Sequence, residues 1–271
     1  MELTAENYYK DTSRLSFSQI VDFMGTPAMR GCEARALAKI SGEYREPPSD
    51  ALILGSLVDV MITGTDEEKR EFMESHPELY SSRGKTAGQL LAKYSIAEAM
   101  VNRLMNNDLC RKTLSGEHQR IFTGKIFGYD FKCKVDSLLP YATVDLKTTA
   151  DLNKGYYIPE LRRYGNFIES RNYALQGAIY QTLVEQGTGK KLPFFITAVD
   201  KHADYPDIDV FQIDQDSMDA ALAEAEPYIE RIVALKNGEA VPESCGCCPY
   251  CRMMKNPKVP RSWLDLGGVA D

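Results

Sequence analysis

A chain of 271 residues, 44% of them hydrophobic and 26% charged, can bury one sizeable α/β core with peripheral helices. Its net charge of −7 argues against a protein that coats nucleic acid non-specifically, because such proteins carry a broad basic surface. No apolar stretch approaches the roughly 18–20 residues that cross a bilayer, and the polar start lacks a signal-peptide run, so we expect a cytoplasmic protein with no membrane partner.

The first part of the chain, residues 15–115, is predicted to be helical, after a loose arm at residues 1–14. Ser16 and Gln19 resemble a capping box, which satisfies backbone N–H groups at the start of a helix. Residues 50–62 (DALILGSLVDVMI) are apolar almost all round, which marks a buried helix. The other expected helices are one at residues 29–40 and several solvated ones within residues 66–115.

Near residue 116 the pattern changes to period-two alternation, which predicts strands through residue 149 with breaks at Gly124, Gly128 and Pro140. The remaining expected elements are a helix at 170–186 ended by Gly187 and Gly189, strands at 193–200 and 208–213, and a helix at 215–236 that Pro227 kinks or breaks. This order predicts an α/β fold with a mixed β-sheet flanked by helices. We expect one domain over residues 1–271, made of a helical part (15–115), a core (116–236) and a cysteine-rich tail (240–271).

The segment VDLKTT, residues 144–149, places an acid and a base on one face of a predicted strand. Side chains two residues apart share a face, so Asp145 and Lys147 project together. Asp136 ends the preceding alternating strand, and a hairpin turned at Pro140 would bring it beside Asp145. Two carboxylates held that close repel unless a cation lies between them, and Mg²⁺ (or Mn²⁺) is the natural partner for such oxygen ligands.

Asp136, Asp145 and Lys147 suit phosphodiester hydrolysis. A divalent ion polarises the scissile phosphate and acidifies a bound water. Lys147 can orient that water and offset the negative charge of the transition state. On its own, however, a D-x-K tripeptide is very common and indicates a solvated strand face with a surface salt bridge.

Four further residues are candidates for the same site. Asp59 is the only charged residue between Leu52 and Ile62, so it is either an exposed position on its helix or a buried metal ligand. Glu117 precedes the strand region and offers another carboxylate, although a loop glutamate is usually just solvated. Gln176 and Tyr180 share a helix face through their i,i+4 spacing and either contact a DNA backbone or border the core.

Four of the seven cysteines lie within SCGCCPYCR near the end of the chain. Cys245, Cys248 and Cys251 are separated by two residues each, with Cys247 as an extra thiol. This spacing suits Zn²⁺ or an iron–sulfur cluster. The alternative is a loop of free thiols.

In combination and in this order, these residues resemble the RecB/RecE-like branch of the PD-(D/E)XK nuclease superfamily, above all phage RecE-type (exodeoxyribonuclease VIII-like) exonucleases. The segments that carry the resemblance are LSFSQIVDFM (15–24), LGSLVDVMI (54–62), GEHQRIF (116–122), KVDSLLPYATVDLKTT (134–149), YALQGAIYQTL (173–183) and the cysteine-rich tail. The resemblance implies a restriction-endonuclease-like fold. It also implies a catalytic core of Asp136, Asp145 and Lys147, with Gln176 and Tyr180 bracing the site and touching DNA.

The resemblance also assigns roles outside that core. Asp59 stands where relatives often carry a metal-binding histidine, and Glu117 matches an upstream acid of RecE-like members. In some RecB-type nucleases an early cysteine, here Cys32, joins three late ones around a [4Fe–4S] cluster, although the last gap in this chain is shorter than in that pattern.

What the resemblance implies for function is 5′→3′ digestion of linear double-stranded DNA in phage-type recombination, for a single-strand annealing protein. It also implies a homo-oligomeric ring whose channel would be lined by basic residues, with Lys154, Arg162, Arg163 and Arg171 as candidates. Two alternatives stay open. One is another nuclease on the same fold, such as a CRISPR-adaptation-like or repair endonuclease; the other is a non-catalytic DNA-binding scaffold.

Overall fold

The structure is a computed structural model that describes residues 3–260 and 262. A five-stranded mixed sheet of strand order β3-β4-β5-β8-β9 forms its centre. Its strands are β3 (Glu117–Ile126), β4 (Tyr129–Leu139), β5 (Ala142–Thr149), β8 (Phe194–Asp200) and β9 (Ile208–Ile213). Only the β5–β8 pair is parallel within this sheet, and the other neighbours are antiparallel.

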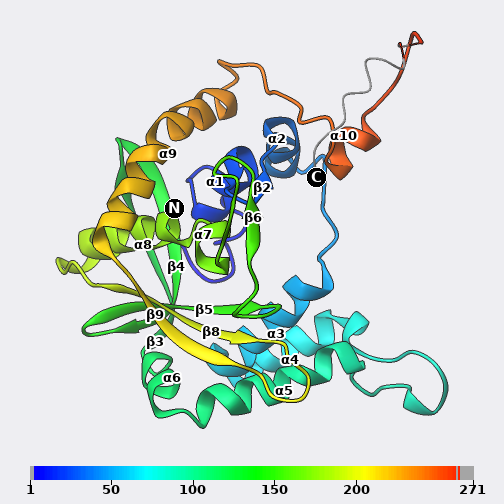
Figure 1. Ribbon diagram of the computed structural model, residues 1–271, viewed down its shortest axis with the longest axis vertical. Coiled ribbons are helices and arrows are strands. Elements are labelled where there is room, and N and C mark those ends of the chain that lie inside the picture. Colours follow the sequence, from blue (N-terminus) through cyan, green and yellow to red (C-terminus); the bar gives the residue numbers. More distant parts are fainter. Residues whose placement is uncertain (1–2, 261, 263–271) are drawn as a thin grey trace.

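Helices cover both faces of the sheet (Figure 1). One layer contains α1 (Phe17–Met24), α2 (Glu33–Ser41), α7 (Phe167–Ser170), α8 (Tyr173–Thr188) and α9 (Gln215–Lys236). The opposite layer contains α3 (Asp50–Thr63), α4 (Asp66–Ser75), α5 (Ala92–Met105) and α6 (Asp108–Thr113), with the short turns η1 (Pro77–Leu79) and η2 (Gly84–Thr86) between α4 and α5. The last helix, α10 (Pro249–Met253), lies beside α2. The predicted mixed sheet flanked by helices is thus confirmed.

Side-chain caps fix where several helices begin. Ser16 accepts the N–H of Gln19 at 3.4 Å and starts α1 at the predicted position. Thr65 and Glu68 form a reciprocal capping box at the start of α4.

Two large apolar clusters separate the layers. Under α1, α8 and α9, Phe131, Cys133 and Val135 of β4 are fully buried against helix residues such as Ile179. On the other face, Leu146 and Val199 meet residues of α3, α5 and α6. The functional side chains between these clusters are therefore held by rigid neighbours on both sides of the sheet.

The structure differs from the sequence-based expectations in several places, among them Gly124, which lies within β3, and Gly187, which lies within α8. Residues 25–30, partly assigned to a helix, form the hairpin β1 (Gly25–Thr26) and β2 (Met29–Arg30), where Gly25 has φ +89° and a Cβ would meet the Met29 carbonyl oxygen at 2.3 Å. Helix α9 continues through Pro227 without a break. A further hairpin, β6 (Tyr156–Ile158) and β7 (Arg163–Gly165), was not predicted.

The arm expected to be loose is instead packed against β4 over its described residues. Tyr8 is buried, and Lys132 donates to the carbonyl oxygens of Tyr8 and Asp11. At the other end, residues 261 and 263–271 of the predicted tail lie outside the described residues. Within the described part of the chain, helices of the length and apolarity that a bilayer span requires are absent.

Candidate metal centre

The candidate site lies where β4 and β5 separate. Their ladder pairs Ser137 with Val144 and ends there, although one more step in the same register would pair Asp136 with Asp145. Instead, the Asp136 side chain enters the gap, and its Oδ2 accepts the backbone N–H of Leu146 at 2.9 Å. The hairpin at Pro140 therefore brings the two predicted acids to neighbouring strands, with one carboxylate inserted between them.

Asp145 is almost fully buried and is held on both sides. Gln176 of α8 donates its Nε2 to Asp145 Oδ1 at 2.7 Å. The Lys147 ammonium lies 2.5 Å from Asp145 Oδ2 and 4.5 Å from the centre of the Tyr173 ring. A buried carboxylate with an amide and an ammonium as partners has a fixed orientation, which a metal ligand requires.

Asp59 reaches the site from α3 and belongs to a small polar network. Thr63 donates to Asp59 Oδ1 at 3.2 Å from one turn further along the helix. Gln119 donates its Nε2 toward both carboxylate oxygens at 3.4 and 3.5 Å and to Thr63 at 3.2 Å. Gln119 has φ +54° within β3, an uncommon conformation for this residue type that turns up at functional sites.

The electrostatics of this group of acids favour a cation. Burial raises the pKa of Asp136 well above its ordinary value, and the charges of Asp145 and Asp59 raise it further. Burial also raises the pKa of Asp59, with the nearby Lys134 opposing the shift. Ionised together, these carboxylates destabilise each other, and a positive ion removes that cost.

The donor set fits a hard divalent ion. Asp59, Asp136 and Asp145 offer carboxylate oxygens, which Mg²⁺ and Mn²⁺ prefer. In addition, the Oε1 atoms of Gln119 and Gln176 are buried without a hydrogen-bond partner among the described residues. Buried acceptors of this kind suit the hydrogens of water bound to an ion.

Lys147 and Tyr180 are both held in their protonated forms. Burial alone would lower the pKa of Lys147, but the charge of Asp145 outweighs it and raises that pKa. Burial and the charge of Asp145 raise the pKa of Tyr180, whose ring packs edge-on against Phe194. The Lys147 side chain is therefore a positive charge beside Asp145.

The structure does not bring Glu117 to the acidic group. Its side chain is 63% exposed, pairs with Arg120 and borders a separate cavity with Pro140 and Lys190. In its place the structure adds Gln119, Thr63 and Tyr173, whose roles no motif in the sequence indicated.

A second acidic group, Asp151, Asp200 and His202, lies at the ends of β5 and β8. Asp200 is fully buried, and its two oxygens accept the N–H groups of His202, Asp207 and Leu152 as well as the His202 ring. These donors lower its pKa, against the effect of burial. With its acceptor capacity already used, Asp200 fastens the surrounding loops and suits an ion poorly.

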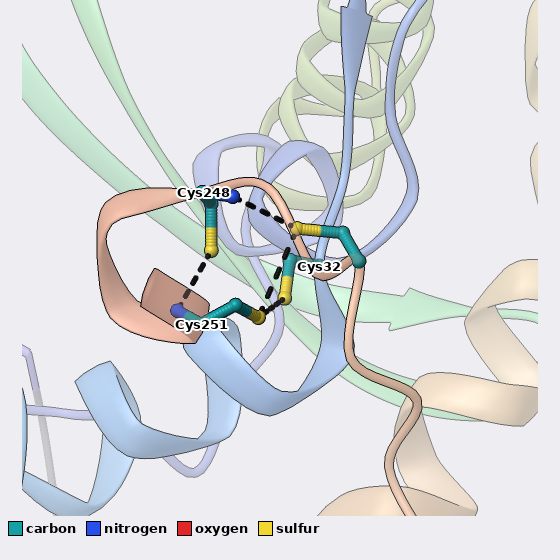
Figure 2. Close-up of side chains that lie close together, drawn as sticks. Cys32, Cys248 and Cys251 are labelled. Carbon is teal, nitrogen blue, oxygen red and sulfur yellow. Dashed lines mark hydrogen bonds between the residues drawn. The ribbon is translucent and has the colours of Figure 1, made fainter. Parts of the chain in front are cut away.

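Four thiols gather where the tail returns to the start of α2. The Sγ atoms of Cys32, Cys245, Cys248 and Cys251 all lie within 4.8 Å of one another, and that of Cys32 is 3.6 Å from that of Cys251. Figure 2 shows Cys32 on the α2 side and Cys248 and Cys251 on the tail. Four sulfurs at about 2.3 Å from one zinc ion are about 3.8 Å apart.

One of these thiols is poised to ionise. Burial opposes ionisation of Cys245, but the N–H groups of Cys247 and Cys248 outweigh it and lower the pKa of the thiol to about 6. The sulfur spacing fits one tetrahedral ion better than an iron–sulfur cube, whose eight atoms hold the thiolates further apart. Cys247 is exposed and lies outside the group of four.

Comparison with known proteins identifies the family. The model of a PDDEXK-like domain of unknown function (DUF3799) matches residues 16–254. A crystal structure of a candidate exonuclease from Eubacterium rectale has 34% sequence identity and a TM-score of 0.92, over 100% of both chains. A second structure, of SSO0001, has 10% identity and a TM-score of 0.37 over 83% of this chain and 81% of the other, too weak a likeness for any inference. A search of curated proteins finds no significant match. Since the family model spans most of the chain, the protein belongs to the PDDEXK-like domain family, within the PD-(D/E)XK superfamily.

Proposed function

We propose that the protein is a deoxyribonuclease that uses Mg²⁺ or Mn²⁺ and acts as an exonuclease on linear double-stranded DNA. One observation carries the proposal: the Asp136 carboxylate occupies the gap between β4 and β5, next to the Asp145–Lys147 pair. The exonuclease name of the Eubacterium rectale relative supports it. The direction 5′→3′, a role in phage-type recombination with a single-strand annealing protein, and a ring-shaped oligomer belong to the same proposal and rest on the resemblance alone.

In this mechanism Asp136 and Asp145, with Asp59, would hold the divalent ion. When bound, such an ion polarises the phosphate and makes a water more acidic. Gln176 keeps Asp145 in place, and Gln119 and Thr63 keep Asp59 in place. Lys147 remains protonated, so its contribution is a positive charge beside the phosphate oxygens.

The experiment compares linear duplex DNA with covalently closed circular duplex, each with Mg²⁺ and with EDTA. Wild-type protein should degrade the linear DNA only and only with the metal, and Asp145→Ala should abolish degradation. Arg111→Ala is a matched control, because Arg111 is exposed on α6 and its side chain contacts Asp108 and the carbonyl oxygen of Met105. Equal attack on circles would replace the exonuclease with an endonuclease, and no metal-dependent cleavage would favour a DNA-binding scaffold.

We also propose that Cys32, Cys245, Cys248 and Cys251 bind one zinc ion that fastens the tail to α2. The Sγ atom of Cys251 lies 3.6 Å from that of Cys32 and 3.9 Å from that of Cys245, and these separations support one ion over a [4Fe–4S] cluster. An ion bound this way contributes to folding, because the ligands come from both ends of the chain.

A further inference from the structure

The β6–β7 hairpin exposes an aromatic pair close to the candidate site. Its register sets Tyr157 opposite Tyr164, and the two rings meet edge to face with centroids 5.5 Å apart. Tyr164 is 70% exposed, and Leu161 at the tip of the hairpin is 55% exposed. Contiguous exposed apolar and aromatic side chains can mark an interaction surface.

The hairpin is anchored from its other side. Ile158 is buried, and a Cβ at Gly165 would meet Ile158 Cδ1 at 2.6 Å, which shows how closely the chain packs there. Arg163 forms a two-pronged ion pair with Glu169 of α7, with one contact at 2.9 Å. Figure 1 shows β6 running beside α7. These contacts fix the hairpin without using the exposed faces of the two tyrosines.

A pocket borders both the hairpin and Tyr173, the aromatic neighbour of Lys147. Tyr156, the first residue of β6, lines it together with Tyr173, over whose ring Lys147 lies. The pocket has a volume of about 210 Å³.

The surroundings of the pocket are basic in a chain whose net charge is −7. Arg171 and Lys201 line it, and both are exposed. Arg162 at the hairpin is exposed, and its side chain has no partner among the described residues. The acids Glu160 and Asp151 offset part of this charge, while Arg163 is neutralised by Glu169. Arg162, Arg171 and Lys201 remain to meet phosphate groups.

We infer that the β6–β7 hairpin binds unpaired bases of the DNA strand next to the cleavage site. Tyr157 and Tyr164 stack on the bases, while Arg162, Arg171 and Lys201 hold the phosphates of a single strand that runs through the pocket toward Lys147. Aromatic rings beside a basic groove are the usual means of binding single strands without sequence preference. The inference rests on the proposed nuclease function, because that function supplies the cleavage site. The binding itself can be measured without catalysis.

The alternative is that the tyrosines only stabilise the hairpin as a cross-strand pair. A double variant, Tyr157→Val with Tyr164→Val, separates the two because valine keeps the strand preference and removes the rings. Tyr157→Phe with Tyr164→Phe keeps the rings. Tyr141→Val is the matched control, since Tyr141 is 53% exposed at the turn between β4 and β5.

The readout is fluorescence anisotropy of a labelled oligothymidylate and of a blunt duplex, with full-length protein in EDTA. We expect the valine pair to bind the oligothymidylate about thirtyfold more weakly, the loss expected for two stacking contacts. The phenylalanine pair and Tyr141→Val should stay within about twofold of wild type, and duplex binding should change far less. Three results would overturn the inference: unchanged oligothymidylate binding by the valine pair, an equal loss of duplex binding, or no oligothymidylate binding by the wild type. Unchanged binding by the valine pair would indicate that the exposed tyrosines contact a protein instead of DNA.

A second measurement covers a valine variant that fails to fold. Wild-type protein is irradiated with a bromouracil-substituted oligothymidylate, and adducts are mapped by mass spectrometry. Adducts at Tyr157 or Tyr164 support the inference, and adducts confined to other peptides refute it. If binding depends on the hairpin but DNA is never cut with any metal, the nuclease proposal fails and the single-strand contact stands.

Discussion

Asp136 Oδ2 accepts the backbone N–H of Leu146 at 2.9 Å, in the position where the β4–β5 ladder would otherwise continue. One side chain therefore completes the hydrogen bonding of β5 and also brings a carboxylate between Asp145 and Asp59. Because of this double role, a substitution that keeps the hydrogen-bond acceptor tests metal binding, while one that removes the acceptor also tests folding.

Asp136→Asn should raise stability when no metal is present. Its amide oxygen can still accept the Leu146 N–H, while the charge is lost. The folded-state pKa of Asp136 is raised, so its contribution to stability is present at low pH and is lost as pH rises through that pKa. In EDTA at pH 8 we expect a gain of about 1 kcal/mol, or about 2–4 °C in melting temperature.

Adding Mg²⁺ should reverse this difference in melting temperature, so that the wild type melts above Asp136→Asn. The ion stabilises the wild type by mass action and has little effect on Asp136→Asn. Asp136→Ala serves as a comparison, because it leaves the Leu146 N–H without its partner and should be less stable than both. If Asp136→Asn melts below wild type in EDTA, the ionised Asp136 carboxylate does not destabilise the folded protein. The inference that burial and neighbouring acids raise its pKa would then be wrong.

Metal affinity should fall as pH falls. Protons compete with the ion for Asp136 and Asp59, whose pKa values are both raised by burial. Calorimetric titration with Mg²⁺ or Mn²⁺ across a pH series should show weaker binding at each lower pH, with protons released on binding. An affinity independent of pH would mean that these carboxylates are ionised before the ion arrives.

Gln119→Ala should weaken metal binding about tenfold, the lower end of the usual effect of removing a group that orients a ligand. Within the described part of the chain, the Gln119 side chain donates to Asp59 and Thr63, and its only hydrogen bond to an expected ligand is the one to Asp59. Gln186→Ala is the matched control, because Gln186 bonds the backbone of Lys125 elsewhere on β3. Equal affinities for wild type and Gln119→Ala would remove Asp59 from the ligand set.

Lys147→Met should lower the cleavage rate about 10²–10³-fold, as the removal of one preorganised charge does in other active sites. Metal affinity should be retained or increased, because the variant removes a positive charge 2.5 Å from Asp145. Cleavage rates measured at saturating metal check the first expectation, and calorimetric titration with the metal checks the second. A loss that saturating metal restores would show that Lys147 supports binding of the ion and not the chemical step.

Purified protein should contain one zinc ion per chain by elemental analysis, with no iron–sulfur absorbance. Cys251→Ser should lose the ion and melt at lower temperature, since Cys251 is buried among the four thiols. Cys247→Ser should keep the zinc ion and the wild-type melting temperature, because Cys247 is exposed and outside the group of four thiols. Iron and sulfide in place of zinc would refute the single-ion proposal.

The sequence predicted the sheet well because its signal is local. Alternation around Phe131, Cys133 and Val135 marks a buried strand face, and the structure buries all three completely. The helix with Gln176 and Tyr180 was likewise predicted, since its apolar stripe has the spacing of one helix face.

Contacts made across the chain escaped prediction. The conformation of Gln119 and its bond to Asp59 join residues 60 positions apart, and no local pattern encodes that pairing. Glu117 was chosen by its position near the strand, but its exposed side chain pairs with Arg120 instead of joining the acidic group. The β6–β7 strands are three residues each, too short for an alternation signal.

The most direct test of the metal centre is a crystal structure with Mn²⁺, in which the anomalous signal locates the ion. We predict a peak within coordination distance of Asp136 and Asp145, on the side toward Asp59. A peak confined to Asp151, Asp200 and His202, or none beside Asp136 at saturating Mn²⁺, would contradict the proposal that these acids hold a divalent ion for DNA hydrolysis.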